Sequence, residues 1–163
     1  KFTYLKKVFK ILKIEKLSNI NLHTQKISEF TSIVAKEKKI RLILKDFQSR
    51  FAKKFNKLCI EGRDIGTVIL PKADIKFFFQ CDINTAAKRR FKELKKQDKS
   101  LTLNNVKKSM KIRDSRDKSR KNSPLLKSHD AIIVDTGKLK NISSMIRKMT
   151  KTIESTIKKK YGN

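Results

Sequence analysis

The stretch Leu58-Cys59-Ile60-Glu61-Gly62-Arg63-Asp64-Ile65-Gly66-Thr67 decides the fold class of this chain. It joins a short apolar run to a turn that carries Arg and Asp between two glycines. Two further apolar runs, at 75–81 and 131–134, are also continuous and do not alternate with polar residues. Continuous apolar runs are typical of strands buried in a parallel sheet. The pattern therefore predicts an α/β domain with a parallel sheet flanked by helices.

Helical patterns lie between these runs. Residues 25–55 carry apolar residues at helical spacing, and the charged residues 36–39 indicate a break between two helices. Asp82 and Ser100 are candidate N-caps of the next two helices. A last helix is expected from Asn141 to about residue 160, with an apolar stripe interpreted as core packing. That stripe consists of Ile142, Met145, Ile146, Met149, Ile153 and Ile157.

The first 22 residues give weaker signals, because their apolar runs are short. Residues 9–14 and 20–22 are predicted to be short strands. The chain begins with Lys1, which suggests a fragment or a processed product. No apolar run has the length of a membrane span, and no signal peptide is visible.

The formal charge of +28 is the strongest compositional feature, and it has two interpretations. One is binding to nucleic acid or another polyanion. The other, which we favour, is a drift of the overall composition towards Lys without a role in binding, because the lysines are spread along the whole chain and do not gather in one block. The few arginines are then the informative cations, since Arg makes planar bidentate contacts with phosphate.

The cysteines and histidines do not suggest a metal site. Cys59 and Cys81 lie within apolar runs and are predicted to be reduced thiols in the core of a cytoplasmic protein. His23 and His129 lie far apart, with no ligand spacing around them. We therefore expect no bound metal ion.

The segment 113–120 (Arg-Asp-Ser-Arg-Asp-Lys-Ser-Arg) carries the clearest chemical signal. Leu103, Val106 and Met110 form an apolar helical stripe, and Arg113 and Asp117 continue it at the same spacing. The inner face of one helix thus changes from apolar to charged. Ion pairs one helical turn apart on a solvent-exposed face are common and weak. The alternative interpretation is therefore that the charged residues of 113–120 simply face solvent and form no site.

Taken together, the charged motifs suggest a phosphorylated small molecule. The loop at 61–67 and the helix at 113–120 supply arginines with interspersed aspartates, and Lys88-Arg89-Arg90 adds a basic face. Arg neutralises phosphate oxygens, and Asp accepts hydrogen bonds from base or ribose donors. Phosphoryl transfer needs mostly positioning and charge stabilisation from the protein.

These motifs resemble those of the bacterial cytidylate kinase family. Residues 62–68 (GRDIGTV), followed by Pro71 and residues 73–76, resemble the family segment GRD-[IM]-GTV-x-x-P-x-A-x-x-K. Residues 113–125 resemble the family's lid, RD-x-RD-x-x-R-x-x-x-PL. The resemblance runs from about residue 20 to the end. Two departures are His23 and Ala86, each at a position where the family usually has Arg.

The resemblance implies roles for individual residues. Ser32, Arg41 and Asp64 match positions that recognise the edge of cytosine. Arg63 and Arg120 match arginines that bind phosphate. Arg113 and Asp117 match residues at the ribose and phosphate of CMP, and Arg116 matches a lid arginine expected near the transferred phosphoryl group. The implied CMP-binding residues are Ser32, Arg41, Arg63, Asp64, Arg113, Asp117 and Arg120, and the implied catalytic residues are Arg63, Arg116 and Arg120.

The resemblance also implies an organisation of the chain. Residues 1–56 would be the remainder of the nucleoside-monophosphate-binding region, and 57–97 the core with the GRD loop. Residues 98–126 would form the lid, and 127–163 a core strand and the C-terminal helix. None of the four glycines belongs to the phosphate-binding motif G-x-x-x-x-G-K-[ST] that such a kinase needs for ATP. The first strand and this P-loop are therefore expected to be missing through N-terminal truncation.

The function implied is that of a phosphotransferase of pyrimidine nucleotide metabolism. Such a kinase transfers the γ-phosphoryl group of ATP to CMP or dCMP, with Mg²⁺ as the ion of the complete enzyme. We expect a cytoplasmic monomer with no membrane partner, and a 163-residue chain that is inactive by itself. The alternatives are a basic protein that binds RNA or another polyanion, which is less favoured, and a degraded kinase remnant.

Overall fold

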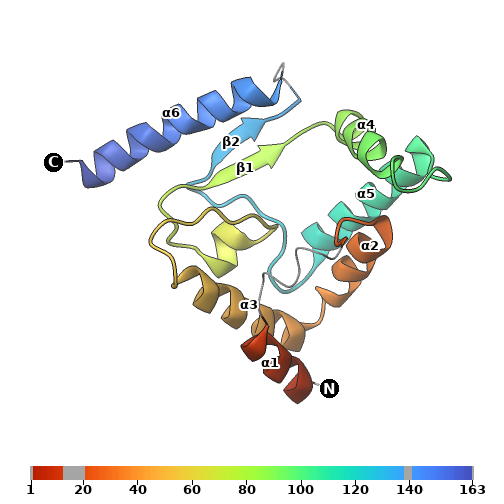
Figure 1. Ribbon diagram of the computed structural model, residues 1–163, viewed down its shortest axis with the longest axis horizontal. Coiled ribbons are helices and arrows are strands. Elements are labelled where there is room, and N and C mark those ends of the chain that lie inside the picture. Colours follow the sequence, from red (N-terminus) through yellow and green to blue (C-terminus); the bar gives the residue numbers. More distant parts are fainter. Residues whose placement is uncertain (1, 13–20, 138–140, 163) are drawn as a thin grey trace.

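The computed structural model of this protein describes residues 2–12, 21–137 and 141–162. Within these ranges the chain is mainly helical, with one small sheet (Figure 1). The elements in chain order are α1 (Phe2–Ile11), α2 (Gln25–Val34), α3 (Lys38–Ala52), η2 (Ile65–Ile69), β1 (Phe77–Gln80), α4 (Ile83–Leu94), α5 (Leu103–Ser119), β2 (Ile132–Asp135) and α6 (Ile142–Tyr161).

The two strands form a parallel pair, which confirms the predicted α/β class. Phe77 lies opposite Ile132, and the register continues to Gln80 opposite Asp135. The Ile132 N–H donates to the Lys76 carbonyl at 2.8 Å, one residue before β1. A parallel pair needs a long crossover connection, and α4 and α5 supply it here.

The helical pair α4 and α5 packs closely, and its first cap is the one predicted. The Asp82 carboxylate accepts hydrogen bonds from the Asn84 and Thr85 amides at 3.0 and 2.9 Å. Ser100 as the next cap is wrong, because its amide is bound to Asp98 in a turn. Thr102 caps α5 instead. Ala87 and Leu94 of α4 and Val106 of α5 are buried.

The predicted break between the first two long helices is confirmed. α2 ends at Val34 and α3 begins at Lys38. The strand predicted at 9–14 is wrong where the structure describes it, because residues 9–11 belong to α1. Phe9 packs against Phe47 of α3, with the ring centroids 5.3 Å apart. The other residues of the predicted N-terminal strands are coil at 12, 21 and 22 or lie outside the described ranges.

The segment 58–60 is also not a strand. It has no regular secondary structure and no strand partner in the described part of the chain, and Cys59 is exposed, so its prediction as a core thiol is wrong. Cys81 is partly buried. The segment 65–69 that follows forms one turn of π-helix, η2. Single π-turns occur frequently at functional sites.

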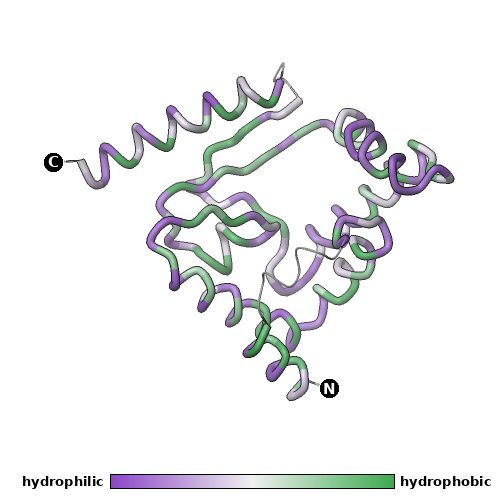
Figure 2. The backbone as a smooth tube through the Cα atoms, in the orientation of Figure 1, coloured by the Kyte–Doolittle hydropathy of each residue, from purple (hydrophilic) through white to green (hydrophobic). Residues whose placement is uncertain are grey.

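The last helix, α6, starts where it was predicted to start, with Asn141 as its N-cap, but its apolar stripe is not core. No residue of α6 is buried, and Ile142 and Ile146 are 71% and 55% exposed. The two-stranded sheet offers little apolar surface for a 20-residue helix to cover. Figure 2 shows the apolar positions that recur along α6 and along the strands. No helix in the described ranges is long and apolar enough to cross a membrane.

Candidate functional site

The loop before η2 places Asp64 inside the protein. Gly62 allows the loop to pass close to the side chain of Ile65, because a Cβ atom at this position would lie only 2.6 Å from Cγ1 of Ile65. Ile65 and Ile69 are buried and anchor η2. The Asp64 carbonyl accepts a hydrogen bond from the Val68 amide at 2.9 Å, so Asp64 begins the turn. The carboxylate of Asp64 is therefore carried by a packed turn and not by a free loop.

The end of α5 supplies the other half of the site. Val106 is buried on the inner face of α5, and Asp117, on the same face, is only 2% exposed. This confirms the predicted change from an apolar to a charged inner face. Arg120 follows the last turn of α5 as its C-cap and is buried as well. A charged residue is rarely this buried unless it is paired.

Asp64 and Asp117 are joined through arginines. Arg41 of α3 forms an ion pair with Asp64. Arg120 lies between the two aspartates, with Nη1 at 3.1 Å from Asp117 Oδ1 and Nη2 at 3.9 Å from Asp64 Oδ1. Residues from α3, from the loop before η2 and from the end of α5 thus meet at one place. The resemblance implied nucleotide-binding roles for these residues but gave no indication that they touch one another.

Arg63 and Arg113 complete the group on the side of α5. Arg63 Nη1 lies 2.6 Å from Asp114 Oδ1 and 2.9 Å from Asp117 Oδ2. Nε of Arg113 lies 3.8 Å from Asp117 Oδ2. We call the whole group the arginine–aspartate cluster. It consists of Arg41, Arg63, Arg113, Arg120, Asp64, Asp114 and Asp117.

The cluster holds four arginines against three aspartates, so positive charge is in excess. Burial, followed by the nearby charge of Arg63, lowers the pKa of Arg113. Burial, followed by the charge of Arg41, lowers the pKa of Arg120. Both guanidinium groups are thus partly desolvated and lie beside like charges, so an additional anion would stabilise them.

Several donors of the cluster are also unused within the described structure. Nε of Arg41, Nε of Arg113 and Nη2 of Arg120 are buried and make no hydrogen bond. A buried donor without an acceptor is costly, so such atoms need an explanation. A ligand with several anionic oxygens would satisfy them, because guanidinium groups match phosphate geometry.

Ser32 and Arg116 lie in a second contact, between α2 and α5. Ser32 is buried; its hydroxyl donates to the Glu29 carbonyl at 2.8 Å and accepts from Arg116 Nη1 at 3.3 Å. The Glu29 carboxylate accepts from Ser109 at 2.7 Å and from Gln25 at 3.0 Å. The hydrogen bond from Gln25, then that from Ser109, lowers the pKa of Glu29. The predicted base-recognition and lid residues therefore touch each other directly.

Sequence reasoning missed two residues here. Asp114 was part of a quoted motif but was not assigned to the site, although it binds Arg63. Its position directly after Arg113 was the available signal. Glu29 carried no such signal, because its partner Ser109 lies 80 residues further along the chain.

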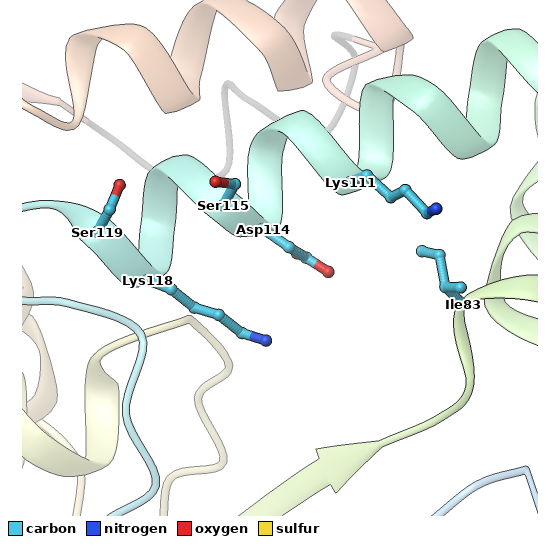
Figure 3. Close-up of a pocket in the computed structure, with 6 residues that line it drawn as sticks. All are labelled: Ile83, Lys111, Asp114, Ser115, Lys118 and Ser119. Atoms are coloured by element: carbon cyan, nitrogen blue, oxygen red, sulfur yellow. The ribbon is translucent and has the colours of Figure 1, made fainter.

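Next to the cluster, one side of α5 borders an open hollow (Figure 3). Lys111 and Lys118 extend towards it from α5, with Asp114 between them and Ile83 of α4 across from them. Asp114 thus belongs both to the cluster and to the wall of the hollow. The hollow adds positive charge beside the cluster.

The basic face of α4 is only loosely associated with this site. Arg89 donates to the Thr136 carbonyl at 3.0 Å, after the end of β2. Arg90 donates to the His23 carbonyl at 2.8 Å and pairs with Glu93. No hydrogen bond or ion pair between these arginines and the cluster is found among the described residues. They connect α4 to its neighbours.

The chemistry of the carboxylates does not fit a metal ion held by the protein alone. Each aspartate of the cluster faces at least one arginine. In the described ranges, no three His, Cys, Asp or Glu side chains gather in a way that could hold a metal. Mg²⁺ is usually bound through one or two carboxylates together with substrate phosphates. The carboxylates of the cluster therefore serve the arginines, and a Mg²⁺ ion would need the phosphates of a substrate as ligands.

Comparison with known proteins gives a consistent result. The family model described as cytidylate kinase matches residues 2–155. A cytidylate kinase of Rickettsia akari (strain Hartford) is 34% identical over 148 residues, covering 91% of this chain and 66% of that protein. One of Rickettsia canadensis (strain McKiel) is 37% identical over 125 residues, covering 77% of this chain and 57% of that protein. The chain thus spans about three fifths of the length of the curated relatives it matches.

Proposed function

We propose, because this chain belongs to the cytidylate kinase family, that it supplies the acceptor-nucleotide site of a kinase for CMP or dCMP. The reaction would transfer the γ-phosphoryl group of ATP to the acceptor phosphate, giving CDP or dCDP. One observation carries this proposal: the cluster has four arginines for three aspartates, and three of its buried guanidinium atoms make no hydrogen bond. A nucleotide phosphate supplies the missing acceptors.

The arginines around Asp117 would hold the phosphate of the acceptor. Arg63, Arg113 and Arg120 all lie within ion-pair distance of the buried Asp117 carboxylate. This shared partner fixes the three guanidinium groups before a ligand arrives, which reduces the ordering cost of binding. In phosphoryl transfer the same charges would stabilise the negative charge spread over the transferred group.

The base would be recognised on the side of Asp64. Its buried carboxylate accepts from Arg41, and the Ser32 hydroxyl is a second buried acceptor. The exocyclic amino group of cytosine is a donor and can bond to a carboxylate, whereas the carbonyl oxygen of uracil at the same position would face the carboxylate unpaired. Sites built to hydrogen-bond one group reject an analogue without it strongly. The proposed preference for CMP over UMP follows.

Arg116 would act at the transferred phosphoryl group. In this structure its guanidinium rests on the Ser32 hydroxyl, 3.3 Å away. A ligand that bonds to Ser32 would compete with Arg116 for that hydroxyl. Arg116 would then be available to stabilise charge that develops during transfer.

The 163-residue chain alone is proposed not to transfer phosphate. Its sequence contains no G-x-x-x-x-G-K-[ST] motif, which cradles the phosphates of ATP in this class of fold. ATP and Mg²⁺ would be held by residues other than those of the cluster. Formation of ADP and CDP from ATP and CMP by the purified chain would contradict this part of the proposal. A cytoplasmic location and a monomeric state remain predictions.

Asp64→Ala tests the proposed base recognition. We expect CMP binding, measured by isothermal titration of the purified chain, to weaken by about 100-fold, because a buried acceptor for the amino group is lost. UMP binding should change much less. Asp46→Ala is the matched control, since Asp46 lies on α3 and makes an exposed ion pair with Arg50. Equal losses for CMP and UMP would refute the assignment of Asp64.

A further inference from the structure

Lys76 is a buried cation outside the arginine–aspartate cluster. Its side chain is 6% exposed and enters the protein at the residue before β1. Its ammonium group donates to the Pro71 carbonyl at 2.5 Å and to the two Asp130 carboxylate oxygens at 3.0 and 2.7 Å. Ser128 Oγ lies 3.5 Å from the same ammonium group. Three segments of the chain therefore meet at one nitrogen.

The stem of Lys76 packs against the turn that carries Asp64. A Cβ atom placed on Gly66 would lie 3.3 Å from Cδ and 3.7 Å from Cγ of Lys76. Gly66 is the second residue of η2, and Asp64 directly precedes η2. The Asp64 carbonyl accepts from the amides of Val68 and Ile69. Movement of η2 would therefore move Asp64 with it.

Stability alone is a weak explanation for this arrangement. The buried ammonium group loses its hydration, and its partner Asp130 is 43% exposed, so water screens the attraction that would offset this cost. The bonds of Lys76 instead fix geometry, because they join Pro71, just beyond η2, to Asp130, just before β2. These bonds thereby connect η2 to the residues just before β2.

We propose that Lys76, held by Asp130, is a positioning residue that sets η2, and with it Asp64 and Arg63, for nucleotide recognition. This inference rests on the proposed function, in which Asp64 recognises cytosine. Lys76 itself contacts no cluster residue by a hydrogen bond or ion pair in the described structure. It acts through the packing of its stem on Gly66 and through its hold on Pro71.

The test is Lys76→Met, which keeps the apolar stem and removes the ammonium group. Small displacements of binding groups have large effects, so we expect CMP affinity to fall about tenfold and the ratio of CMP to UMP affinity to fall with it. A purely structural role would lower the melting temperature and leave this ratio unchanged. Lys160→Met is the matched control, because it breaks the exposed pair of Lys160 with Asp74.

Two further measurements keep the inference testable. Asp130→Asn keeps Lys76 and leaves one side-chain carbonyl oxygen as an acceptor, so we expect the ratio of CMP to UMP affinity to fall less than in Lys76→Met. This variant also tests the inference if Lys76→Met does not fold. Hydrogen exchange at the Val68 and Ile69 amides should become faster in both variants and stay unchanged in Lys160→Met. This readout requires no nucleotide.

The outcomes separate this inference from the proposed function. An unchanged CMP-to-UMP ratio and unchanged exchange in Lys76→Met, together with a lost preference in Asp64→Ala, would overturn the role of Lys76 and leave the proposed function intact. Equal binding of CMP and UMP by the unmodified chain would overturn both. Loss of the ratio together with faster exchange of the turn supports the positioning role.

Discussion

The arginine–aspartate cluster and the sheet with α6 are organised in opposite ways. In the cluster, charged side chains from three parts of the chain form ion pairs with one another in the interior of the protein. Around the sheet, large apolar side chains remain uncovered: Phe79 and Ile133 of the strands and Ile142 and Ile146 of α6 are all exposed. The polar site is thus the better-connected part of the described structure. Its neighbours in space are distant in sequence, whereas α6 is connected mainly at its end, through Asp74.

This contrast predicts where substitutions will be most harmful. The largest effect is expected at Asp117, whose removal leaves Arg63, Arg113 and Arg120 without their shared partner. Removing one member of a buried ion pair costs about 3–5 kcal/mol. Asp117→Ala should therefore lower the free energy of unfolding by that amount in urea titrations. Asp46→Ala, which removes an exposed partner, should stay within about 0.5 kcal/mol. Similar values for both would mean that the cluster does not stabilise this chain.

A second, smaller effect is expected on the stability of the protein at acidic pH. Hydrogen bonds from Lys76 and then Ser128 lower the pKa of Asp130 from 3.8 to about 2. A carboxyl whose pKa is lowered by folding stabilises the protein above its unfolded pKa and loses that contribution as pH falls through its folded pKa. The Lys76–Asp130 contribution should thus be complete above about pH 4 and disappear towards pH 2.

Asp130→Asn measures this contribution directly. The stability difference between the unmodified protein and this variant, followed by thermal unfolding, should be constant near neutral pH and shrink between about pH 4 and pH 2. Asp74→Asn provides a comparison, because the pKa of Asp74 is also lowered, first by Lys160 and then by Tyr161. Asp74 lies before β1 and holds the end of α6. A difference that is independent of pH would contradict the charged pair at Asp130.

Sequence reasoning succeeded where one element carried the whole signal. The phase of Val106, Arg113 and Asp117 on a single helix predicted which face of α5 turns inward. The cap Asp82 and the start of the last helix at Asn141 were likewise local features. The type of apolar run also predicted a parallel sheet, which β1 and β2 form, although Phe79 and Ile133 are exposed and not covered as such runs suggest.

It failed where structure depends on partners that the local pattern does not reveal. A short apolar run fits a strand or a buried helix equally well, and packing of Phe9 on Phe47 selects the helix α1. Residues 58–60 suit a strand, but a strand also needs a neighbour to pair with. Lys76 and Asp130 form an ion pair although they lie 54 residues apart in the sequence, and no periodic pattern predicts this contact. Contacts of this kind arise from the fold as a whole.

The smallest effect is expected on α6, where the apolar stripe resembles a core in sequence but not in structure. Ile146 is 55% exposed, so Ile146→Ser should change the unfolding free energy of this chain by no more than about 0.5 kcal/mol. Val106→Ala on α5 is the matched comparison, because Val106 is 2% exposed and its truncation leaves a cavity, at a cost of about 1–2 kcal/mol. Urea unfolding of both variants measures the difference. If Ile146→Ser costs as much as Val106→Ala, then α6 is part of the core in solution, and the contrast between the two regions fails.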